Sequence, residues 1–197
     1  MSSKKPAAAV APVAKVPKKS SGVLSPMSLA FLVVVLAVAV QVVSIPSVTG
    51  PPASNKPFGS FSSFYPFYAS EHTDRTNRQL HFAGTCCVIL LFLLNPKSVP
   101  SLLFSAAVGY ILCPMLIGLS HGLVEFACVV SLFLLMHKLS TGGFGVAVSI
   151  PLIGYTCAWV GHFMFEHNRP ATFIYPTYSL MGDFYMFSRI ITGAEKF

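Results

Sequence analysis

Charged residues are scarce in this chain. Of 197 residues, 13 are Lys or Arg and 6 are Asp or Glu, so 10% are charged, against about 25% in an ordinary soluble domain. This is too little charge to cover a globule of this size with a hydrated surface. Hydrophobic residues make up 54% of the chain, and the mean hydropathy is +0.69. The composition disfavours a soluble enzyme and favours a multi-span membrane protein.

Basic residues are also few outside the N-terminal tail. Five of the 13 positive residues lie within the first 19 residues, which contain no acid: Lys4, Lys5, Lys15, Lys18 and Lys19. The net charge of +7 therefore comes mostly from the tail. No basic stripe alternates with aromatic residues, so the sequence predicts no nucleic-acid partner.

Paired cysteine spacings are absent as well. The five cysteines (Cys86, Cys87, Cys113, Cys128 and Cys157) lie inside apolar runs, and none forms a C-x-x-C pair. This excludes a disulfide framework and a structural zinc site, and it indicates small buried side chains. The chain also lacks G-x-G-x-x-G, P-loop, G-x-S-x-G and H-E-x-x-H motifs, so nothing supports nucleotide, acyl-serine or zincin chemistry.

Long charge-free runs are what the chain has instead. Residues 27–45 contain no charge and are long enough to cross a bilayer, which predicts an N-terminal anchor helix. Four more apolar stretches follow, over residues 82–95, 100–118, 122–138 and 144–165. The predicted fold is all-α, a multi-span transmembrane helical bundle with four core spans in addition to the anchor.

The remaining segments have different compositions. Residues 1–26 predict a disordered basic tail, and residues 46–63, rich in Pro, Ser and Gly, predict a loop. The membrane domain would then cover residues 64–192. Within it, residues 179–192 carry a helical stripe made of Leu180, Phe184, Phe187 and Ile191, opposite Ser188 and Arg189. This pattern is typical of an amphipathic helix on the membrane surface.

Histidines gather on one side of the predicted membrane. If each of the four core spans crosses once, then His72, His81, His121 and His162 share one face, and His137 lies on the other. Neutral histidine is the commonest metal ligand, and ionisable groups near hydrocarbon indicate function. Because His72 and His81 are nine residues apart, both can reach one metal only if a helix begins between them or if they lie on separate elements. Residues 74–77 offer a cap at that place.

Spacing alone leaves other interpretations open. A single histidine at a membrane interface is more often a hydrogen-bonded boundary residue than a metal ligand. A small transporter or channel would also carry histidine and glutamate near the membrane. However, the ionisable groups cluster on one face instead of following a path through the bilayer, which argues against transport.

Two long motifs resemble a known family. FYPFYASEHTDRTNRQLHFAGT (64–85), AWVGHFMFEHNRPATFIYP (158–176) and the following SLMGDF (179–184) are similar to the 2-hydroxy fatty acid dioxygenases. These are small multi-span proteins with short bacterial members and a fungal endoplasmic-reticulum enzyme. The resemblance covers about residues 60–190. It implies a multi-pass membrane protein, with the endoplasmic reticulum as the expected location.

The resemblance also implies a reaction and a cofactor. The expected reaction is Fe(II)-dependent cleavage of a 2-hydroxy fatty acid by dioxygen, between C1 and C2, which leaves a chain one carbon shorter. This is a step in the degradation of phytosphingosine. The histidines at the family's motif positions, here His72, His81 and His162, are the implied iron ligands. The fatty chain of the substrate would lie in the lipid bilayer or between the spans.

Three further residues are candidates for catalytic roles. Arg169 is the candidate for binding the substrate carboxylate, because a guanidinium can bind a carboxylate through two hydrogen bonds. Glu166, which is i+4 from His162, and Asn77 are candidates for orienting the metal ligands. A rival hypothesis is a catalytically silent structural or assembly protein with the same fold, since this chain has Asp74-Arg75 where family members commonly have Asn-Pro.

Overall fold

The computed structural model describes residues 50–197, and within this range every regular element is helical. The predicted tail (1–26) and anchor (27–45) lie outside the described residues. The helices are α2 (Phe61–Ser70), α3 (Arg75–Leu94), α4 (Val99–Met115), α5 (Leu123–Thr141), α6 (Gly145–Gly161) and α7 (Pro176–Ile191). Two 3₁₀ turns, η1 (Pro96–Ser98) and η3 (Ala171–Phe173), and a π-helical turn, η2 (His162–Glu166), complete the fold.

Four helices of the described chain are long and apolar enough to cross a membrane: Arg75–Leu94, Pro96–Met115, Leu123–Thr141 and Gly145–Glu166. The four predicted core spans are thereby confirmed. Their outward faces are apolar: Leu93 and Leu94 on α3 and Leu152 on α6 are more than three-fifths exposed. Exposed leucines in such numbers suit contact with lipid.

Two helix starts differ from the sequence expectation because of polar caps. α3 begins seven residues before the predicted span, since the Asp74 side chain accepts a hydrogen bond from the Asn77 backbone N–H. α2 begins at Phe61, inside the predicted loop, because Ser60 caps it through the Ser63 N–H. Side-chain caps satisfy backbone donors that would otherwise be unpaired, so they set where a helix begins.

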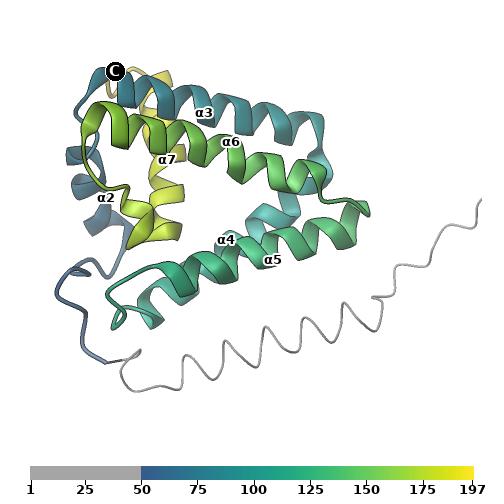
Figure 1. The fold of residues 1–197 in the computed structure, drawn as a ribbon, viewed down its shortest axis with the longest axis horizontal. Helices are drawn as coiled ribbons and strands as arrows, with labels where there is room; N and C mark the ends of the chain where they lie inside the picture. The colour runs from purple at the N-terminus through teal and green to yellow at the C-terminus, as the bar shows by residue number, and fades with distance from the viewer. Residues whose placement is uncertain (1–49) are drawn as a thin grey trace, which may run out of the picture.

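The long helices form two antiparallel pairs. Figure 1 shows α3 beside α6 in one layer and α4 beside α5 in the other, with α7 crossing between the layers at one end. The start of α3 and the end of α6 lie at that same end, next to α2. The chain alternation thus brings the predicted histidine face together at the end where α2 and α7 pack.

α7 is the amphipathic helix expected over residues 179–192, but it packs into the bundle. Its buried side chains include Tyr178 and Met186, and it contacts α2, α3, α4 and α5. Leu180 and Phe184, predicted to face the membrane surface, instead line a cavity between the long helices. The other helices of the bundle provide apolar partners for these side chains. The hydrophobic periodicity of α7 does not show whether its apolar face contacts lipid or other helices.

Close contact between α3 and α6 depends on a glycine. A Cβ atom added at Gly84 would lie 2.8 Å from the Cβ of Cys157, closer than real Cβ atoms approach. Gly84 therefore lets the two helices approach closely, as small residues do in membrane bundles. The pair is important because each helix carries one of the histidines described below.

We expect Gly84→Ala to lower the stability of the protein in detergent by about 1–3 kcal/mol, because the added methyl group overpacks the α3–α6 contact. Thermal unfolding followed by circular dichroism measures the change. Gly59→Ala is the matched control, since nothing lies within 4 Å of its Cβ. Equal melting temperatures for both variants would contradict this account of the helix pair.

Candidate metal centre

Three buried histidines meet at the end of the bundle. His72 follows α2, His81 lies in the second turn of α3, and His162 begins the π turn after α6. Their ring centroids are 4.5 Å (His72–His81), 4.6 Å (His72–His162) and 5.1 Å (His81–His162) apart. The side chains are 1%, 4% and 2% exposed. One ring nitrogen from each lies within 4.8 Å of the others, so the three residues could bind a metal ion.

Each ring is oriented by a hydrogen bond at Nδ1. That of His72 lies 2.6 Å from the Tyr68 carbonyl oxygen, and that of His81 lies 2.6 Å from Oδ1 of Asp183. The Nδ1 of His162 lies 2.6 Å from Oδ1 of Asn168. All three oxygens act as acceptors, so each Nδ1 carries the proton and donates. In the neutral form of each ring, the lone pair is then on Nε2.

The opposite nitrogens lack partners. Nε2 of His72 and Nε2 of His81 are buried and make no hydrogen bond with the described residues. A buried polar atom without a partner destabilises a fold, unless a ligand, ion or water satisfies it. Two orphaned lone pairs beside a third imidazole fit a metal ion, because imidazole Nε2 is a common ligand of iron, zinc and copper.

Burial keeps His72 uncharged. Removal from water, together with the nearby His81 and His162, lowers its pKa to about 3. The ring is therefore neutral at physiological pH. A neutral imidazole has the free lone pair that metal binding requires.

Asp183 on α7 orients the cluster from behind. Its Oδ1 accepts hydrogen bonds from His81 Nδ1 and from the Tyr68 hydroxyl, both at 2.6 Å. Burial tends to raise the pKa of Asp183, but His81 and these hydrogen bonds outweigh it, so the pKa lies below its ordinary value. An ionised carboxylate behind a histidine fixes the tautomer and increases the basicity of the ligand nitrogen. Asp183 therefore orients the His81 ring so that its Nε2 could bind a metal.

The other two histidines are oriented by local structure. Tyr68 lies one turn before His72. Gly182 leaves room for the Tyr68 ring, because a Cβ atom added at Gly182 would lie 2.8 Å from that ring. The π turn ends at Glu166, and the next residue, His167, has a left-handed backbone (φ 57°). This change of direction lets Asn168 reach His162. Asn168 also donates to the Glu71 side chain and carbonyl, which leaves its oxygen to accept from His162. Single π turns are frequent at functional sites.

Glu166 joins the segments that carry His72 and His162. Its carboxylate accepts hydrogen bonds from both the backbone and the hydroxyl of Thr73, from the Asp74 N–H and from the Asn77 amide, at 2.6–2.9 Å. Asn77 is fully buried against Gly161. Neither side chain bonds to a histidine ring. Their contacts fit a positioning role that acts through the backbone.

Comparisons with known proteins point to one family. The family model described as 2-hydroxy-palmitic acid dioxygenase Mpo1-like matches residues 58–195, which is well over half of the chain. The chain belongs to the Mpo1-like family. No match was found among curated proteins or among solved structures. The matched range contains all three histidines and every residue that orients them.

Arg169 lies apart from the histidine cluster of this Mpo1-like chain. It is exposed and lines a cavity of about 720 Å³ with His121, Trp159 and Phe163, and none of the three clustered histidines lines that cavity. Its predicted role in binding the substrate carboxylate stays a prediction. His121 is exposed too, and its Nδ1 accepts from the Leu123 N–H.

Sequence reasoning did not single out Asp183 and Asn168 as partners of the ligands. Both lie inside the motifs that carry the family resemblance, SLMGDF and FEHNRP. Asp183 is 102 residues from His81 along the chain, so no local spacing indicates the pair. The sequence did offer one signal for Asp183, which is a carboxylate within an apolar helix. Burying such a group without a partner is unfavourable, so a partner could have been expected.

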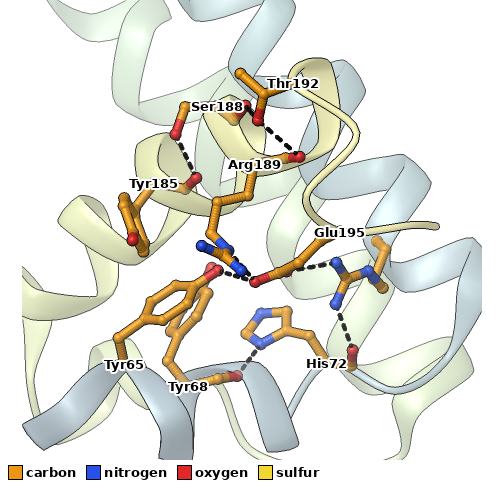
Figure 2. Close-up of polar contacts among 9 residues, drawn as sticks. Tyr65, Tyr68, His72, Tyr185, Ser188, Arg189, Thr192 and Glu195 are labelled. Atoms are coloured by element: carbon orange, nitrogen blue, oxygen red, sulfur yellow. Dashed lines mark hydrogen bonds and ion pairs between the residues drawn. The ribbon is translucent and has the colours of Figure 1, made fainter. Parts of the chain in front are cut away.

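The C-terminal segment contacts the residues around His72, which lies in the loop between α2 and α3. Figure 2 shows Glu195 joined to Tyr65 and Arg189, with distances of 2.9 Å and 2.6 Å. Glu195 also accepts from Arg78 at 2.7 Å, and Arg78 in turn donates to the His72 carbonyl. Burial raises the pKa of Glu195, but the bonds from Arg78, Arg189 and Tyr65 lower it below the ordinary value.

Asp183→Asn should weaken metal binding by about 10- to 100-fold, because the His81 tautomer is no longer held by a charged acceptor. Isothermal titration with a divalent metal under anaerobic conditions measures the affinity. Tyr68→Phe removes one hydrogen bond to Asp183 but leaves the carboxylate, so its effect should be smaller. If the two variants lost the same affinity, the charge of Asp183 would not be what matters.

The Glu195 network should make stability depend on pH. Because the folded pKa is lowered, the stabilisation is present above the ordinary value of 4.5 and is lost as pH falls through the folded pKa. The wild type should therefore melt at a higher temperature than Glu195→Gln at pH 7, and the difference should shrink below about pH 4.5. A difference that grew on acidification would have the wrong sign.

Proposed function

We propose that this protein is an Fe(II)-dependent dioxygenase that cleaves 2-hydroxy fatty acids between C1 and C2. The product would be a chain one carbon shorter, as in the degradation of phytosphingosine, and the endoplasmic reticulum is the proposed location. One observation carries the proposal: three buried imidazoles, each with Nδ1 beside a hydrogen-bond acceptor, offer ring nitrogens that lie within 4.8 Å of one another. Membership of a family described as acting on 2-hydroxy-palmitic acid supplies the substrate class.

Imidazole ligands suit iron as well as zinc and copper, and the dioxygenase description of the family favours iron among them. The three histidines form this cluster without a carboxylate among the described residues, which leaves other coordination positions for substrate and dioxygen. Zinc has no redox chemistry, so it would not serve a dioxygenase. Bound iron would supply the electron chemistry by which dioxygen reacts.

The chain's own residues would position the reactants. Asp183, Asn168 and the Tyr68 carbonyl each hold the proton of one histidine at Nδ1. Glu166 keeps the His72 loop against the π turn of His162. The surrounding core of Phe64, Tyr68 and neighbouring aromatic residues excludes water from this end of the bundle.

A silent structural protein with this fold is the alternative. Orphaned nitrogens on His72 and His81 count against it. A purely structural core would gain stability by replacing them with apolar side chains of similar size, because each buried donor or acceptor without a partner destabilises the fold. The lowered pKa of His72 removes it from a charged structural pair as well.

The test compares two histidine variants in detergent after anaerobic loading with iron(II). His162→Ala should lose iron and abolish dioxygen uptake on addition of 2-hydroxypalmitate, whereas His121→Ala should keep both. Mass spectrometry of the lipid product should show a chain one carbon shorter for wild type. Wild-type protein that takes up no iron and consumes no dioxygen would favour the silent structural protein.

A further inference from the structure

An apolar cavity lies between the long helices. It has a volume of about 90 Å³ and is lined by residues from all four spans and from α7, including Leu102, Phe133, Gly154 and Phe184. The one charged residue in this lining is Asp183, whose carboxylate also holds His81. The cavity therefore ends at the residue that orients a proposed iron ligand.

A smaller pocket connects this cavity with the histidine cluster. It measures about 40 Å³ and is lined by His81 and Thr85, together with residues that line the larger cavity as well: Val88, Gly154, Leu180, Asp183 and Phe184. Five shared wall residues make the two spaces neighbours. The path from the cluster into the bundle runs between α3 and α6, past Gly154.

On the other side, the cavity adjoins an open groove between α4 and α7. The groove measures about 420 Å³ and shares Leu102, Leu180 and Phe184 with the cavity wall. Its rim includes Leu103, which is 64% exposed on α4. Because α4 is one of the membrane-spanning helices, the groove opens toward lipid and not only toward water.

We infer that this series of spaces is the binding site for the alkyl chain of the substrate acid. The chain enters from the bilayer through the α4–α7 groove, passes Leu102, Leu180 and Phe184, and places its polar head at the His81 end. This inference rests on the proposed function for the identity of the head group. The volume of the cavity is well below that of ordinary ligand pockets, which is about 300–1,000 Å³. Part of the alkyl chain therefore occupies the groove.

Three features select an alkyl chain as the occupant. The lining is apolar along its length, with polar atoms gathered at the end that meets the histidines. The three spaces adjoin one another through shared wall residues, Leu180 and Phe184 among them. A soluble polar substrate would find no hydrogen-bond partners along this path, and desolvating it there would be unfavourable.

Gly154 controls the width of the passage. A Cβ added there would lie 3.5 Å from a methyl group of Val88, which is an ordinary contact. Alanine therefore fits without strain, whereas a leucine side chain extends into the space that both the cavity and the small pocket share. Gly145 on the same helix is exposed, with nothing within 4 Å of its Cβ, and serves as a matched control.

The first experiment locates the chain without requiring turnover. Full-length protein in lipid nanodiscs, loaded anaerobically with iron(II), is irradiated with 2-hydroxypalmitate that carries a diazirine midway along its chain. Mass spectrometry should find labels on cavity residues such as Leu102 and Phe133, and unlabelled 2-hydroxypalmitate should compete. Labels only on outward residues such as Leu93 and Leu152, without competition, would overturn the inference.

The second experiment narrows the passage. Gly154→Leu should raise the KM for 2-hydroxypalmitate at least tenfold and reduce cavity labelling, while iron content stays near wild type. Gly154→Ala should give an intermediate effect, and it replaces the leucine variant if that protein fails to fold. Gly145→Leu should change nothing. A folded Gly154→Leu protein whose KM and cavity labelling stay at wild-type values would contradict a chain-binding passage.

The two proposals fail in different ways. Competed labelling of the cavity in a wild-type protein that consumes no dioxygen would uphold the chain site and overturn the dioxygenase. Turnover of 2-hydroxypalmitate together with labels confined to the outer surface would uphold the dioxygenase and overturn the chain site.

Discussion

The arrangement of three histidine rings depends on the hydrogen bonds at their Nδ1 atoms. Each bond assigns the proton to one side of the ring and leaves the other nitrogen free, and the acceptors come from α2, α7 and the loop after the π turn. Two of these nitrogens, on His72 and His81, are buried and have no partner among residues 50–197. A fold retains such atoms at the expense of stability, which indicates a site kept for a ligand.

Much of the remaining structure serves to hold these acceptors in place. The small residues Gly84, Gly161 and Gly182 allow backbone and rings to approach where larger residues would collide. Glu166 and Glu195 then fasten the two loops, the first by binding backbone N–H groups and the second by joining two arginines and Tyr65. The three histidines are supported by contacts from several elements, which favours a preorganised site.

The same helices that carry the ligands also enclose the apolar spaces. α3 contributes both His81 and Val88, and α7 contributes both Asp183 and Phe184. With this arrangement, the proposed lipid substrate would reach the histidine end without leaving hydrocarbon. The polar head and the alkyl chain would then be recognised by different ends of the same pair of helices.

Sequence alone determined the fold class and the four spans, because hydrophobic length is a property of the linear order. Chain alternation placed four histidines on one face, and the resemblance of two motifs to a known family implied which three are the candidate ligands. The sequence also located the helix break between His72 and His81, since a capping pattern is local. It did not reveal Asp183 and Asn168 as partners, the backbone role of Glu166 or the position of α7 inside the bundle. Those depend on contacts between residues up to about a hundred positions apart, and only the packing of the helices decides which residues meet.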